Sequence, residues 1–130
     1  MAEVYGNASS IHYQGQLAKQ RLEIARRQVG ALLHCDAREI VFVSGGTEAN
    51  KLAIFGSVQN GQHVITSSIE HPAVLNPCSE LTRAGVEVTP VPVGSEGVVD
   101  QDDLRQALRP NTALVSIMQA THEPGAPQPN

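Results

Sequence analysis

The sequence has 130 residues, of which 41% are hydrophobic and 17% are charged, and a formal net charge of −4. These totals predict a single globular domain, and the acidic balance argues against a nucleic-acid surface, which needs clustered Lys and Arg. The sequence has no apolar run of the ~20 residues that a membrane helix needs, and its start has no signal-peptide pattern. Cys35 and Cys78 have no CxxC spacing. We therefore expect a reduced protein of the cytoplasm.

The order of helix-like and strand-like segments predicts the fold class. Apolar residues recur at helical spacing in some segments, whereas β-branched runs such as "IVFV" and "HVITS" favour strands. Helices are predicted at residues 16–33, 47–57, 72–85 and 100–110, and strands at 39–43, 63–67, 86–93 and 112–118. This alternation predicts a three-layer α/β/α fold with a mostly parallel sheet. We expect an extended N-terminal segment at 1–15, an α/β core at 16–118 and a loop tail at 119–130.

Local signals refine these boundaries. Asp36 and Glu39 have the spacing of a capping box, but the β-branched residues after them favour a strand rather than a longer helix. Pro77 is costly inside a helix, so a start after Asn76 is the alternative for the third helix. The prolines of "VEVTPVPV" place the end of that strand near a sheet edge or a loop. Acidic residues in the first turn of the last helix and Arg109 near its end agree with the helix dipole.

Ligands of parallel α/β sheets bind beyond the carboxyl ends of the strands, which marks the loops 44–47, 67–72 and 119–125. In the first loop, Gly45 and Gly46 permit a sharp turn. Thr47 would then open a helix whose free N–H groups attract an anion such as phosphate. An ordinary turn with Thr47 as the N-cap explains the same residues.

The other two loops carry polar residues that could contact a ligand. His71, at a predicted strand end, could stack on a flat ligand or transfer protons, although a solvent-facing loop histidine is an alternative. Glu70 is expected to be a surface charge. The third loop offers possible pocket contacts, or a generic loop, in Gln119, Thr121, His122 and Glu123. No metal site is predicted, because the other histidines have no metal-ligand spacing.

Five motifs in combination resemble one family. They are "GNASSIHYQG", "AREIVFVSGGTEANKLAI", "HVITSSIEHPAVL", "GVEVTPVPVGSEGVVD" and "LRPNTALVSIMQATHEPG", and they cover nearly the whole sequence. Together they resemble the cysteine desulfurases of the class V aminotransferase group, which depend on pyridoxal 5′-phosphate and serve iron–sulfur cluster assembly. Selenocysteine lyase has the same motif set.

The resemblance implies a fold and a set of site residues. The fold would be part of the large domain of a fold-type I enzyme, which works as a homodimer. Gly46 and Thr47 would bind the phosphate of the cofactor, and His71 would stack on its pyridine ring and take part in proton transfer. His122 stands where the family usually has an asparagine that contacts the ring hydroxyl. The substrate would be L-cysteine, or L-selenocysteine in the lyase.

The resemblance also implies that catalytic groups are missing. The family carries, further along its chain, an aspartate for the pyridine nitrogen, the lysine that attaches the cofactor and a cysteine that accepts sulfur. Lys19 and Lys51 are the only lysines here, and neither they nor Cys35 and Cys78 match those positions. We therefore expect a fragment or truncated form that is inactive alone and associates with a second copy or with the rest of the large domain. A non-catalytic α/β binding module is the alternative.

Overall fold

The computed structural model describes residues 5–120 and residue 128. The chain divides into two compact units, residues 1–42 and residues 43–130, and each is described here by itself.

The first unit is built around the long helix α1 (Tyr13–Leu32), which confirms the predicted helix and extends its start. A turn precedes the helix, in which the Asn7 carbonyl accepts from the Ser10 N–H at 2.9 Å. This turn lies so close to α1 that a Cβ on Gly15 would stand 2.6 Å from the Asn7 carbonyl oxygen. Only glycine therefore fits there. The predicted apolar stripe is uncovered at the helix end, where Leu32 is 78% exposed.

The predicted strand at residues 39–43 is wrong. Instead, the short 3-10 helix η1 (Ala37–Glu39) begins with the capping box of Asp36 and Glu39, and residues 40–43 have no regular structure. Val41 is 61% exposed, and the Arg26 guanidinium lies 5.1 Å from the centroid of the Phe42 ring. A β-branched run becomes a strand only when a neighbouring strand pairs with its backbone, and none among the described residues does so.

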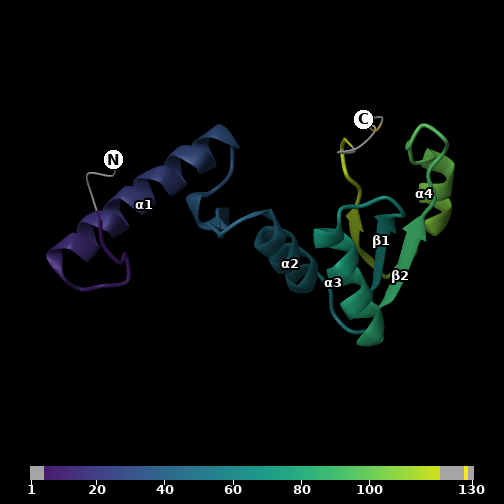
Figure 1. Cartoon of the computed structure of the whole chain (residues 1–130), viewed down its shortest axis with the longest axis horizontal. Coiled ribbons are helices and arrows are strands. Elements are labelled where there is room, and N and C mark those ends of the chain that lie inside the picture. Colours follow the sequence, from purple (N-terminus) through teal and green to yellow (C-terminus); the bar gives the residue numbers. More distant parts are fainter. Residues whose placement is uncertain (1–4, 121–127, 129–130) are drawn as a thin grey trace. The chain divides into compact units, whose positions relative to one another are not determined.

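The second unit contains a parallel three-stranded sheet with helices on both faces (Figure 1). Its elements are α2 (Gly46–Ser57), β1 (His63–Ser67), α3 (Pro72–Arg83), β2 (Glu87–Val91), α4 (Gln101–Ala107) and β3 (Thr112–Ser116). The strand order is β2-β1-β3, so β1 is central. Neighbouring residues of a strand face opposite sides: Val64 packs with α2 and α3, and Ile65 packs with Leu104 and Ala107 of α4. The predicted three-layer α/β/α arrangement is thus confirmed in this unit.

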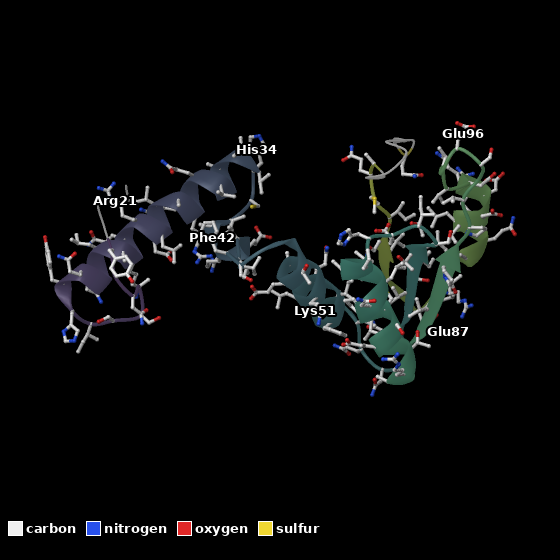
Figure 2. All side chains as sticks on the ribbon, viewed as in Figure 1. Arg21, His34, Phe42, Lys51, Glu87 and Glu96 are labelled. Atoms are coloured by element: carbon white, nitrogen blue, oxygen red, sulfur yellow. The ribbon has the colours of Figure 1, made fainter. Side chains whose placement is uncertain are left out.

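The structure decides two predicted helix boundaries. Helix α3 begins at Pro72, as the predicted range has it, and not at the alternative start after Asn76, and Pro77 lies inside it with its ring fully buried. Proline lacks only the N–H that would reach one carbonyl in the first turn, and its buried ring packs in the core in return. Helix α4 ends at Ala107, so Arg109 lies beyond it and forms an ion pair with Glu87 at the start of β2 (Figure 2). The proline-containing strand β2 is an edge strand, as its sequence predicts.

Candidate functional site

The glycine loop, residues 44–47, opens helix α2 as the sequence predicts. Gly45, not Thr47, is the N-cap, and it caps without a side-chain hydrogen bond. Apart from adjacent residues and the nearby backbone of α2 itself, no heavy atom lies within 4 Å of the position that a Cβ would take on Gly45 or Gly46. The first N–H groups of a helix have no partner within the helix, so this open space lies beside unpaired donors and the positive end of the helix dipole. Thr47 is exposed there.

The carboxylate of Glu48 holds the start of the glycine loop through hydrogen bonds. Glu48 Oε2 accepts from the backbone N–H of Ser44 at 2.7 Å and from its hydroxyl at 2.6 Å. This is the capping-box device shifted one residue outward, because Glu48 is the third helical residue and the N-cap is Gly45. The bonds from Ser44 hold the pKa of the Glu48 carboxyl below its ordinary value. The sequence analysis did not single out Glu48, although its spacing from Ser44 is a recognisable signal.

A shallow hollow of about 660 Å³ runs along α2 from the glycine loop. Thr47 lines it at one end and Phe55 near the other, with Lys51 between them. Figure 2 shows Lys51 on this helix. Leu52, which also lines it, is 52% exposed. The apolar side chains on this face of α2 are therefore exposed, and the face adjoins the helix N-terminus, whose N–H groups suit an anion.

His71 is the N-cap of α3. Its Nδ1 accepts the backbone N–H of Ala73 at 3.0 Å, and its carbonyl accepts from the N–H groups of Val74 and Leu75. An Nδ1 that accepts a hydrogen bond places the proton of the neutral ring on Nε2. The ring is exposed, and it is not among the residues that line the hollow beside Thr47. The two predicted site residues thus open neighbouring packed helices without sharing that hollow.

The prediction that Glu70 is a surface charge is wrong. Glu70 is only 6% exposed, and its Oε1 accepts from the Ser67 hydroxyl at 3.2 Å and from the Met118 N–H. The local sequence does not reveal this burial, because one of the two donors, the Met118 N–H, lies 48 residues further along the chain, two residues after the end of β3. Its negative charge and the burial of Cys78 both raise the pKa of that thiol, with burial the larger cause. Cys78 is thus a poor nucleophile.

His63 is a structural residue at the opposite end of β1. Its ring is fully buried, with Nδ1 2.9 Å from the Thr112 hydroxyl and Nε2 2.8 Å from the Thr89 hydroxyl. Burial and, to a smaller extent, the charge of Arg109 lower the pKa of His63, and the charge of Glu87 opposes them. Within residues 5–120 and 128, no cluster of His, Cys, Asp or Glu could hold a metal ion.

The third predicted loop lies almost entirely outside the described residues, and so does His122. At its start, the carbonyl of Gln119 accepts from the N–H of Gln128 at 2.8 Å. The Gln128 side chain in turn bonds the Gly97 carbonyl at 2.8 Å and the Val99 N–H at 2.9 Å. No helix in the described part of the chain is long and apolar enough to cross a membrane.

A parallel α/β unit with an open helix N-terminus on one side and a histidine-capped helix beside it defines an α/β protein suited to an anionic ligand. The family model for aminotransferase class V matches residues 1–130, and the chain belongs to that family. It is 45% identical to cysteine desulfurase IscS of Dictyoglomus turgidum over 133 residues, covering 99% of this chain and 34% of the relative. It is 46% identical to the mitochondrial cysteine desulfurase of Arabidopsis thaliana over 130 residues, covering 96% of this chain and 29% of the relative.

Solved structures agree with this family. A structure of SspA in complex with cysteine has a TM-score of 0.85 and 35% identity, over 98% of this chain and 38% of that chain. A NifS-like protein has a TM-score of 0.83 and 38% identity, over 98% of this chain and 36% of that chain. The chain spans about a third of the length of the curated relatives named above. It therefore corresponds to about a third of cysteine desulfurase-like proteins, and its second unit has the α/β fold of part of a fold-type I domain.

Proposed function

We propose that this chain is a cofactor-binding segment of a pyridoxal-phosphate-dependent cysteine desulfurase. The whole protein would convert L-cysteine to L-alanine and pass the sulfur to an acceptor, working as a homodimer. The observation that carries this proposal is the glycine loop, in which the N-terminus of α2 has no side-chain cap and has open space at Gly45 and Gly46, within a matching family model. Selenocysteine lyase has the same motifs and is the alternative within the family. Two unpaired cysteines, Cys35 and Cys78, agree with a reducing compartment such as the cytoplasm.

The residues of the glycine loop fit a phosphate group. The N–H groups of Gly46 and Thr47 and the exposed Thr47 hydroxyl are donors at the positive end of a 12-residue helix. Lys51, one turn further along α2, lines the adjoining hollow together with Glu48, so its positive charge there is accompanied by a negative one. When bound, pyridoxal phosphate supplies an electron sink for carbanion chemistry at the amino acid. The loop would hold and orient it.

His71 would provide the flat surface and the proton carrier. Because its Nδ1 accepts from Ala73, the proton of the neutral ring is on Nε2, which is the atom that could donate a proton. His122 would make a further contact to the ring hydroxyl in place of the family's asparagine.

The 130-residue chain would not catalyse the reaction alone. Lys19 and Lys51 do not match the position of the family's cofactor-attaching lysine, and Cys78 is buried with a raised thiol pKa. A second candidate, a non-catalytic module that associates with a partner, is favoured by the exposed Leu52 and Phe55 beside the hollow. Such an uncovered apolar face is typical of a surface that another part of a protein covers.

An absorbance titration of the purified chain with pyridoxal phosphate tests the proposal. We expect a saturable spectral change, no release of sulfide from cysteine above that of free cofactor, and no lysine-specific adduct after borohydride reduction. The variant Thr47→Ala should weaken binding by roughly 10- to 150-fold, since a hydrogen bond to a charged group contributes roughly 1.5–3 kcal/mol. The matched control is Ser57→Ala, which removes a hydroxyl from the other end of α2 and should bind as the unchanged chain does.

Two results would count against the proposal. If no saturable change occurs, this chain does not form the cofactor site by itself. If Thr47→Ala and Ser57→Ala bind equally well, the phosphate is not held at the glycine loop. A specific adduct at Lys51 would contradict the expectation that no lysine of this chain attaches the cofactor.

A further inference from the structure

The buried carboxylate of Glu70 connects two strands at their carboxyl ends, where the predicted ligand loops begin. Both of its donors are at strand carboxyl ends: Ser67 is the last residue of β1, and Met118 follows the end of β3 by two residues. A carboxylate that is only 6% exposed is unfavourable unless hydrogen-bond donors compensate for lost water. Glu70 therefore links the loop after β1 to the neighbouring strand β3.

The same loop is also tied on its other side. The N–H of Ser68 donates to the carbonyl of Val91, the last residue of β2, at 2.9 Å. Residues 68–70 thus make hydrogen bonds to the last residues of β1 and β2 and to Met118, just beyond the end of β3. His71 comes next, so its backbone starts from a fixed point of the sheet.

The ring of His71 is fixed by a separate contact. The Ala73 N–H donates to its Nδ1, which sets the side chain relative to α3. The loop and the cap are therefore independent: the first places the backbone of His71 and the second directs its ring. A change at Glu70 can displace His71 without removing any atom that His71 contacts through its cap.

We propose that Glu70 is a positioning residue for His71. By joining the ends of β1 and β3, it holds the backbone of His71 in the position from which the imidazole would stack on the flat ring of the cofactor, and it holds the backbone of Met118 immediately before the third predicted loop. The inference rests on the proposed function for its ligand, pyridoxal phosphate. Glutamine keeps a side-chain oxygen that accepts from both Ser67 and Met118, whereas alanine keeps neither contact.

Comparing the affinities for pyridoxal phosphate and inorganic phosphate distinguishes a displaced His71 from a general loss of structure. Pyridoxal phosphate uses the glycine loop and His71, whereas inorganic phosphate uses the glycine loop alone. In Glu70→Ala we expect the affinity for pyridoxal phosphate to fall about tenfold and the affinity for inorganic phosphate to stay unchanged. Glu70→Gln should restore the affinity to within about threefold of the unchanged chain. The matched control, Glu80→Ala on the exposed side of α3, should change neither affinity.

The inference can fail separately from the proposed function. If Glu70→Ala lowers both affinities equally, or lowers neither, Glu70 does not act through His71. If the unchanged chain does not bind pyridoxal phosphate at all, the proposed function of this chain fails, and NMR decides the inference. The resonances of the His71 ring and the Met118 amide should then shift in Glu70→Ala and return in Glu70→Gln. Unshifted resonances would overturn the positioning role.

Discussion

The two loops that open α2 and α3 differ in how they are held. The His71 loop follows a strand that is paired on both sides, and it is tied to three strand ends through Ser68 and Glu70. The glycine loop follows residues 40–43, which form no strand, and its side-chain hydrogen bond is the local one between Ser44 and Glu48. The helices behind the loops differ in the same way. Helix α3 buries Ala73, Val74, Pro77, Cys78 and Leu81, whereas α2 buries only Ile54.

This difference shows that the donors of a site and the position of those donors can depend on different parts of the fold. The glycine loop has its donors whether or not a strand precedes it, because the N–H groups and the dipole belong to α2 itself. Its position depends on packing, and that packing rests largely on one side chain. The His71 loop is placed by the sheet. The variants below test whether the glycine loop is the less firmly placed of the two.

The largest effect is expected from Ile54→Ala. Ile54 is 3% exposed and belongs to the core cluster with Val64, Val74 and Leu81. Truncation should cost about 2–5 kcal/mol of the free energy of unfolding of the second unit, from lost burial and the cavity left behind. Because no other buried residue holds α2, its amides should exchange with solvent much faster. Urea unfolding and hydrogen exchange measure the two effects.

The control for this variant is Leu52→Ala on the same helix. Leu52 is 52% exposed, so its truncation should change stability by less than about 1 kcal/mol. If Ile54→Ala accelerated exchange in β1 and α3 as much as in α2, the two loops would unfold as one cooperative element, and the proposed difference between them would be wrong.

A smaller effect is expected from pH, through His63. Burial and the charge of Arg109 place the pKa of His63 in the folded chain below its ordinary value of 6.5. Between these two pKa values the unfolded chain binds a proton that the folded chain does not, so stability decreases as pH falls. The contribution of His63 is complete above pH 6.5 and is lost as pH falls through the folded pKa.

Urea midpoints between pH 8 and pH 5.5 measure this effect while most carboxylates stay ionised. Acid should destabilise β1, from which the His71 loop extends. The His71 loop should then be less firmly held, and its stability should become closer to that of the glycine loop. His12→Gln, which removes an exposed histidine of the first unit, should keep the same pH dependence. A midpoint that does not change over this range would show that His63 is not kept neutral by its burial.

Sequence patterns predicted the elements of the second unit well, because their signals are local or periodic. The run "HVITS" formed the central strand, and the proline-containing strand lies at the edge. The strand predicted at residues 39–43 did not form, because strand formation depends on a partner that composition cannot show. The alternative helix start after Asn76 is wrong, because the burial of Pro77 offsets its missing N–H.

The candidate site was predicted in the same uneven way. The open N-terminus of α2 follows from "SGGTE", since glycines and a helix start are local features. The capping role of His71 and the burial of Glu70 do not follow from sequence. The first depends on where α3 begins, and the second on a donor at Met118, in another strand's loop. Long-range hydrogen bonds of this kind have no sequence spacing to recognise.

The smallest effect is expected from Glu48→Ala, and it should be confined to the glycine loop. Glu48 is exposed and bonds only the N–H and hydroxyl of Ser44, so its removal should speed hydrogen exchange at the Ser44 amide without moving the urea midpoint. Protonation should have the same effect. The folded pKa of Glu48 lies below its ordinary value of 4.5, so the bonds persist above that pH and are lost as pH falls through the folded pKa.

Glu96→Ala, in an exposed turn, is the control and should leave Ser44 unchanged. Unchanged exchange at Ser44 in Glu48→Ala would mean that the loop is ordered by the packing of α2 and not by its own carboxylate. Ile54 would then place both the helix and its anion-binding end.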